Sequence, residues 1–178
     1  THARTHARTQ EPAAGKSTGR YIDQDDKGDL VDEIAEHAVM LSDARELLPP
    51  AELETKGFTL RSWPTKCKDF TSEDELINTY YTEMISLVKE ACGAKRVLIF
   101  DHTIRESGKT NLNARTGGSA GAVSRVHCDY TAESAPRRLA LLGKQGVYSR
   151  VRKRMLTEED VAKLARGRYA FVNVWRSI

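Results

Sequence analysis

Residues 72–92 carry the strongest helical pattern in the sequence and constrain the fold more than any other stretch. Ser72 and Glu75 stand at capping-box spacing, and Gly93 occupies the usual position just after a helix. Apolar residues recur between them on one stripe: Leu76, Ile77, Tyr80, Met84, Leu87, Val88 and Ala91. A helix with one apolar stripe needs a second layer to cover it, and we expect that layer to be a sheet.

Four other segments have the pattern of strands. Residues 58–63 alternate apolar and polar side chains and end at Pro64. Residues 97–100 are uniformly apolar, which is typical of a strand covered on both faces. Further strands are predicted at 125–131 and 168–176.

Two shorter helices separate the last two of these strands. The first begins at Ser134 and ends at Gly143. The second has an acidic first turn after Thr157 and ends at Gly167. With these helices and strands we expect an α+β fold.

The composition is that of one globular domain with a tail. Of the 178 residues, 39% are hydrophobic and 30% are charged, which is enough to build a core. Residues 1–20 have no apolar periodicity, so they predict a disordered tail before a single domain over 21–178. A net charge of +3 is too small to indicate nucleic-acid binding.

Cysteine usage and apolar run lengths predict a cytoplasmic protein. The three cysteines are odd in number and lack metal-type spacing, as expected of reduced thiols. Apolar runs are too short to span a bilayer, so no membrane partner is predicted. The basic, acid-poor start leaves an organelle transit peptide open. The sequence opens on Thr1 and stops at Ile178 directly after a strand pattern, so we expect an incomplete domain.

The pair His127 and Asp129 is the main candidate for chemistry. It lies on the predicted strand 125–131, where alternation puts both side chains on one face and Cys128 on the other. A histidine and a carboxylate can supply two of the three ligands of a facial-triad iron site. A plain His–Asp hydrogen bond on a half-exposed strand explains the same pattern, so the pair alone leaves both interpretations open.

Three further features have competing interpretations. Asp101 and His102 are adjacent at a strand end, so a regular strand would turn them to opposite faces, although a catalytic role for His102 stays open. The glycine-rich stretch 105–122 has the length of a lid or substrate loop. The stretch 137–154 holds seven basic residues and no acidic one, which fits a solvated face, capture of an anionic substrate or a nucleic-acid contact.

Several blocks together resemble a known family. They are Asp43-Ala44-Arg45, Gly57-Phe58-Thr59-Leu60, Val97 to Arg105, Arg125 to Thr131, and Phe171 to Ile178. In this order they resemble the hydroxylase/desaturase family that includes the gibberellin desaturase and cephamycin-biosynthesis relatives. Its members are similar to non-haem iron, 2-oxoglutarate-dependent oxygenases. The resemblance covers about residues 40–178; Ser177 stands where the family usually has proline, and the Arg150 to Arg154 region is longer than expected.

The resemblance implies a fold, cofactors and ligands. It implies a double-stranded β-helix (jelly-roll) core, here partial, with N-terminal and flanking helices. It also implies Fe(II) held by His127 and Asp129, together with 2-oxoglutarate, dioxygen and a small organic substrate. The family's second iron-binding histidine lies downstream of the Asn-Val-Trp-Arg block, so the fragment is expected to be inactive. Residues predicted to orient the ligands are Arg125, Tyr130, Asn173 and Arg176.

Two alternatives accompany this interpretation. The first is a non-catalytic binding module that holds an anionic partner through residues 137–154. The second is an inactive relative that keeps only the fold. The sequence leaves the substrate, the choice between hydroxylation and desaturation, and the oligomeric state open.

Overall fold

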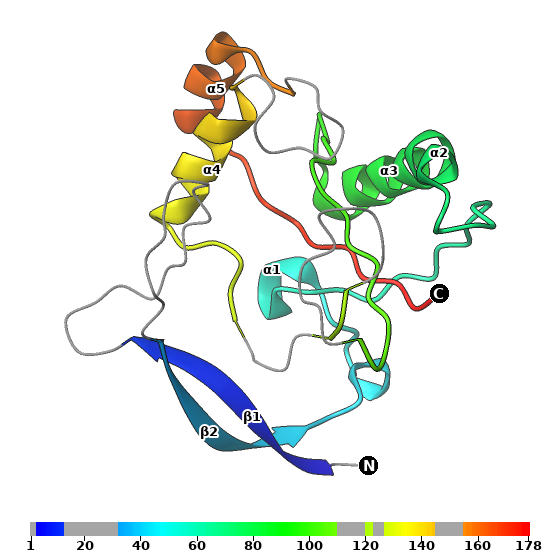
Figure 1. Cartoon of the computed structure of the whole chain (residues 1–178), viewed down its shortest axis with the longest axis vertical. Helices are drawn as coiled ribbons and strands as arrows, with labels where there is room; N and C mark the ends of the chain where they lie inside the picture. The colour runs from blue at the N-terminus through cyan, green and yellow to red at the C-terminus, as the bar shows by residue number, and fades with distance from the viewer. Residues whose placement is uncertain (1–2, 13–31, 110–119, 123–126, 145–154) are drawn as a thin grey trace.

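The computed structural model describes residues 3–12, 32–109, 120–122, 127–144 and 155–178. In Figure 1 the two strands form a ribbon at one end of the molecule, and the last two helices lie together at the other end. The C-terminal segment, in red, runs from these helices across the middle of the molecule. In chain order the elements are β1 (Ala3–Pro12), β2 (Asp32–Leu41), the 3-10 helix η1 (Ala44–Glu46), α1 (Leu53–Lys56), α2 (Glu73–Glu75), the π-helix η2 (Leu76–Tyr80), α3 (Tyr81–Cys92), α4 (Ser134–Leu142) and α5 (Glu158–Ala165).

Strand β1 of the β1–β2 ribbon lies where the sequence predicts a tail. The strands are antiparallel, with Ala3 opposite Leu41 and Pro12 opposite Asp32. The disordered tail was predicted over residues 1–20, whereas residues 3–12 form β1. An antiparallel ladder can pair backbone groups without any apolar periodicity, so the side-chain pattern gives no sign of this pairing.

The helix predicted over 72–92 is confirmed, with one irregular turn. The Ser72 side chain accepts a hydrogen bond from the Glu75 amide, and Gly93 ends α3 in the left-handed region at φ 63°. The turn η2 is π-helical, with the Tyr81 amide bonded to the Leu76 carbonyl. Because a π turn spans one extra residue, Tyr81 is buried on the apolar stripe, and Tyr80, which was predicted there, is half-buried.

The predicted strands do not form ladders. Among the described residues, the segments 58–63, 97–103, 127–131 and 168–176 carry no strand, and pairing near them is limited to a bridge between Arg105 and Ala120. The burial expected of these segments is also incomplete, since Phe58, Leu60 and Leu98 are exposed. A strand needs a neighbouring strand for its backbone groups, and an apolar pattern alone does not supply one. The double-stranded β-helix therefore stays a prediction.

Helices α4 and α5 pack around a hydrophobic cluster, and both match predicted helices. Thr157 and Asp160 form a capping box at the start of α5. Leu139, Leu142 and Leu156 are buried together. A Cβ at Gly143, which ends α4, would lie 2.6 Å from Cγ2 of Val161 on α5. This close approach requires glycine. Partly buried apolar residues complete the cluster: Phe100, Met155, Val161, Leu164, Tyr169 and Phe171.

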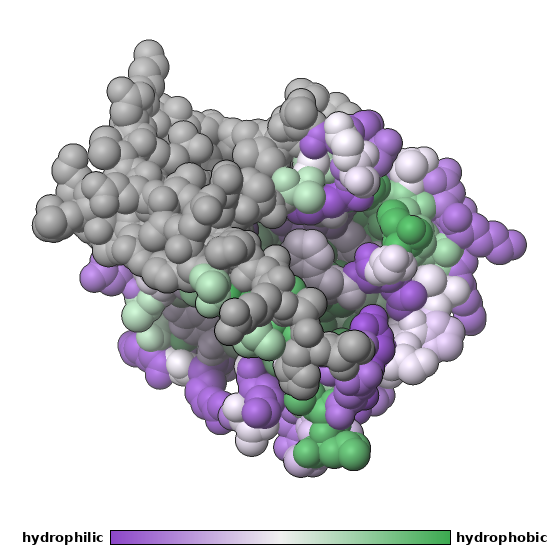
Figure 2. Space-filling model, turned by 90° about the horizontal axis from the view of Figure 1, so that it is seen from below, coloured by the Kyte–Doolittle hydropathy of each residue, from purple (hydrophilic) through white to green (hydrophobic). Residues whose placement is uncertain are grey.

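The surface mixes apolar and polar side chains. Figure 2 shows apolar residues, in green, in separate patches among hydrophilic ones, in purple. Large apolar side chains with high exposure include Leu48 at 92% and Trp175 at 77%. Within the described ranges, no helix is long and apolar enough to cross a membrane.

Candidate functional site

His127 and Asp129 lie together at the surface of a pocket. The Nε2 atom of His127 is 3.3 Å from Oδ1 of Asp129, and the two side chains are 38% and 44% exposed. Both residues line the same pocket. The two side chains therefore share one side of the chain, as the sequence predicts, although residues 127–131 form no ladder.

Asn173 reaches this pair from the C-terminal segment. Its Nδ2 donates a hydrogen bond of 2.6 Å to Oδ2 of Asp129, across 44 residues of chain. Asn173 also lines the pocket. The structure thus brings together three of the residues that the sequence singles out.

Aromatic side chains build one wall of the pocket, whose volume is about 490 Å³. The rings of Tyr130 and Phe171 are stacked, with centroids 4.4 Å apart and an interplanar angle of 26°. Tyr169 packs edge-on against Phe171 at 5.9 Å. Burial raises the pKa of the Tyr130 hydroxyl, and the nearby Arg138 acts in the opposite direction. The small side chains of Ala132, Ala135 and Ala170 also line the pocket.

The donor atoms fit two positions of a metal site. Neighbouring ligands at about 2.1 Å from one ion at a right angle lie roughly 3.0 Å apart, close to the 3.3 Å between Nε2 and Oδ1. A neutral imidazole and a carboxylate are the donor types that iron(II) takes in facial-triad sites. Among the described residues, no group of three His, Cys, Asp or Glu side chains is placed to hold a metal ion. Metal binding by His127 and Asp129 therefore stays a prediction.

The other predicted residues are divided between the pocket and other parts of the chain. Tyr130 lies in the pocket wall, and Arg125 lies outside the described residues. Arg176 does not reach the pocket, because its guanidinium donates to the Trp63 carbonyl and lies 5.8 Å from the Tyr80 ring centroid. It joins the C-terminal segment to the region around α3.

His102 and the basic stretch also lie apart from the pocket lining. His102 Nδ1 shares a hydrogen bond of 2.6 Å with the Tyr81 hydroxyl. Of the stretch 137–154, residues 145–154 lie outside the described part, and Arg138 lies 4.9 Å from the Phe100 ring centroid. Its role as a binding face stays a prediction, as does the lid proposed for 105–122, of which residues 110–119 are also outside.

Two pocket residues have roles that the sequence did not indicate. Phe171 was predicted as core only, yet it packs against the α4–α5 core and also lines the pocket. Its spacing of two from Asn173 is the signal that could have placed both on one side. Cys128 was predicted to face away, yet it also lines the pocket, because residues 127–131 are not a regular strand.

Comparison with known proteins identifies the family. A family described as "Oxidoreductase/YMDC permease-like domain" matches residues 9–178, nearly the whole chain. The chain belongs to this oxidoreductase family. No solved structure matches it.

Several curated relatives of this chain carry oxygenase names. A protein of a fungal species named "Alpha-ketoglutarate-dependent dioxygenase phiK" is 30% identical over 71% of this chain and 42% of its own length. The "Hydroxylase/desaturase efuI" of Hormonema carpetanum is 28% identical over 79% of this chain and 45% of its own. An uncharacterized protein of the dcmA 3' region of Methylophilus leisingeri is 27% identical over 90% and 80%. The chain thus spans less than half the length of the two fungal relatives.

Proposed function

We propose that this oxidoreductase is an iron(II)- and 2-oxoglutarate-dependent oxygenase that hydroxylates or desaturates a small organic metabolite. The observation that carries the proposal is the pair of His127 Nε2 and Asp129 Oδ1, 3.3 Å apart at a pocket of about 490 Å³. The names of the fungal relatives, an alpha-ketoglutarate-dependent dioxygenase and a hydroxylase/desaturase, support it. Alpha-ketoglutarate is another name for 2-oxoglutarate.

His127 and Asp129 would hold the metal in their neutral and ionised forms, respectively. A protonated imidazole has no lone pair for a cation, so His127 must be neutral to bind. Asp129 must be ionised, and its negative charge would offset one of the two positive charges of the ion. Bound there, iron(II) would supply the activation of dioxygen that the oxidation of 2-oxoglutarate and substrate requires.

The pocket would hold the substrate beside these two residues. Its volume matches the lower part of the range for small-molecule sites, which is about 300–1,000 Å³. The stacked rings of Tyr130 and Phe171 offer an apolar surface to a carbon skeleton. Packing of the substrate there would exclude water from the side of the pocket that the rings line.

The proposal requires a third ligand from outside the described residues. A facial triad uses three protein side chains and leaves three positions of the metal open. Among the described residues, His127 and Asp129 would be two of these side chains, and no third His, Cys, Asp or Glu is placed beside them. We propose that the third is the histidine implied by the family resemblance, within a double-stranded β-helix to which the segments 97–103, 127–131 and 168–176 would contribute strands.

The test is iron-dependent release of succinate from 2-oxoglutarate by the purified full-length protein. We expect the wild type to form succinate with added Fe(II), and His127→Ala and Asp129→Ala to lose at least a hundredfold of that rate. His102→Asn, which lies outside the pocket lining and keeps an acceptor for Tyr81, should retain the wild-type rate. Turnover that survives both alanine substitutions would contradict the proposal.

A further inference from the structure

The two carboxylate oxygens of Asp129 have different partners. Oδ2 accepts the 2.6 Å hydrogen bond from Asn173 Nδ2, whereas Oδ1 is the atom that lies 3.3 Å from His127 Nε2. The amide of asparagine is neutral, so Asn173 holds the carboxylate without adding a positive charge beside it. One oxygen is therefore fixed by the protein, and the other stays turned toward the imidazole.

The backbone around Asn173 is held in place by a ring contact. Phe171, two residues earlier, stacks on Tyr130, which directly follows Asp129. Side chains two residues apart lie on the same side of an extended chain. The ring stack and the amide hydrogen bond are thus two neighbouring contacts between the same two segments, and together they fix the place of Asn173 relative to Asp129.

We propose that Asn173 is a positioning residue for the metal site. Its amide holds Oδ2 and thereby keeps Asp129 as a one-oxygen ligand, with Oδ1 facing the position that His127 also faces. A carboxylate bound through one oxygen takes one coordination position instead of two and leaves more positions for 2-oxoglutarate and dioxygen. This inference rests on the proposed function, because it assigns a role to Asn173 in the same site.

The test titrates Co(II) into the purified full-length protein. The visible absorption of bound Co(II) reports both its affinity and its ligand geometry without any turnover. We expect Asn173→Ala to weaken Co(II) binding roughly ten- to a hundredfold and to change the absorption spectrum. The matched control is Val172→Ala. Val172 is the neighbouring residue, its side chain is exposed, and it lies outside the pocket lining, so this variant should bind Co(II) as the wild type does. Asn173→Gln, which keeps the amide on a longer side chain, should restore part of the affinity.

Two results would overturn the inference. One is an Asn173→Ala protein with the affinity and spectrum of the wild type while His127→Ala binds no Co(II); the proposed function would then stand. The other is an equal loss in Val172→Ala, which would indicate a general effect on the segment.

A wild type that binds no Co(II) would instead contradict the proposed function. In that case the hydrogen bond is judged without metal, from the melting temperatures of Asn173→Ala, Asp129→Ala and the double variant. If the melting temperature of the double variant is no lower than that of the less stable single variant, Asn173 does stabilise the Asp129 carboxylate. If the two losses in melting temperature add, the inference is overturned.

Discussion

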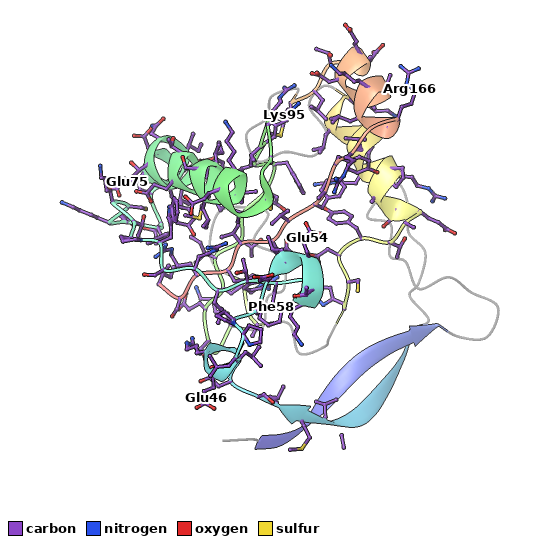
Figure 3. The ribbon with its side chains drawn as sticks, turned by 180° about the vertical axis from the view of Figure 1, so that it is seen from behind. Glu46, Glu54, Phe58, Glu75, Lys95 and Arg166 are labelled. Carbon is purple, nitrogen blue, oxygen red and sulfur yellow. The ribbon has the colours of Figure 1, made fainter. Side chains whose placement is uncertain are left out.

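The region around α3 and the region around the pocket are held together in different ways. In the first, two glutamates of the helix bind the backbone of residues 65–69, here called the clamped loop. Glu83 accepts from the Thr65 hydroxyl and the Lys66 amide, and Glu75 accepts from the amides of Lys68 and Asp69. Figure 3 shows Glu75 at the start of this helix, beside that loop.

The pocket is held by contacts that cross much longer stretches of chain. Asn173 and Phe171 meet Asp129 and Tyr130 through one hydrogen bond and one ring stack. The partners in the clamped loop are 6 to 18 residues apart, whereas Asn173 and Asp129 are 44 apart. Three of the four hydrogen bonds in the first region come from backbone amides, whereas the contacts in the second join side chains to side chains.

This difference leads us to expect that stability and the proposed function depend on different regions of the molecule. Hydrogen bonds from backbone amides to helix side chains fix the clamped loop without depending on the loop's own side chains. In the pocket, by contrast, His127 and Asp129 are partly exposed, so a metal ion can reach them. The position of Asp129 depends on a few long-range contacts. Substitutions near α3 should therefore change stability alone, and substitutions in the pocket should change metal binding most.

Phe171 is the position where this separation should fail. It belongs to the α4–α5 core and also stacks on Tyr130 in the pocket. We expect Phe171→Ala to lower the free energy of unfolding by about 2–3 kcal/mol, since the ring is half-buried, and to weaken Co(II) binding as well. Denaturant unfolding and Co(II) titration measure the two effects. Val172→Ala is the control, and a Phe171→Ala protein with unchanged Co(II) binding would show that the ring stack does not support the site.

Gly143→Ala should lower stability without changing the pocket. The added methyl would lie 2.6 Å from Cγ2 of Val161, so we expect a loss of about 1–2 kcal/mol in the free energy of unfolding. In a Val161→Ala background the clash is absent, and the same substitution should cost much less. Equal losses in both backgrounds, measured by urea unfolding, would show that the close approach of α4 and α5 is not the cause.

Tyr81→Phe tests the hydrogen bond between α3 and His102. The hydroxyl lies 2.6 Å from Nδ1 of His102 on a side chain that is 8% exposed. Its removal should cost about 1 kcal/mol and leave Co(II) binding unchanged, because neither residue lines the pocket. The matched control is Tyr80→Phe, which removes the hydroxyl of a half-buried ring that packs edge-on against Phe70. A change in Co(II) affinity would link the two regions.

Glu83→Gln should have the smallest effect, and that effect should depend on pH. Hydrogen bonds from the Thr65 hydroxyl and the Lys66 amide, with Arg176 nearby, lower the pKa of Glu83 from its ordinary value of 4.5. A lowered folded-state pKa stabilises the fold above the ordinary value and loses that contribution as pH falls through the folded pKa. The melting temperature of the variant should therefore lie about 1–2 °C below that of the wild type at pH 7, and the gap should close in acid. A gap that widens in acid would contradict the sign of the shift.

Predictions from sequence succeeded where hydrogen bonds are local. Ser72 and Thr157 begin helices as their side chains indicate, and Gly93 ends α3 because a glycine adopts positive φ at little cost. The patterns at 58–63 and 168–176 predicted strands with buried apolar side chains, but neither segment forms a ladder, and Phe58, Leu60 and Trp175 are exposed. Pairing and burial both depend on a neighbouring layer, which local spacing does not specify. The extra residue in the π turn, which buries Tyr81 in place of Tyr80, has no signature in apolar spacing.

Local sequence pattern was enough to predict the helices at 72–92, 134–143 and 157–167 and the closeness of His127 to Asp129. Side chains two residues apart lie on one side of a locally extended chain. Only the tertiary structure decided that Asn173 would hold one oxygen of Asp129 and that Phe171 would stack on Tyr130. A contact across 44 residues depends on how the whole intervening chain packs, including α4 and α5. Local spacing cannot encode that outcome, since closing so long a loop is decided by the sum of many side-chain contacts.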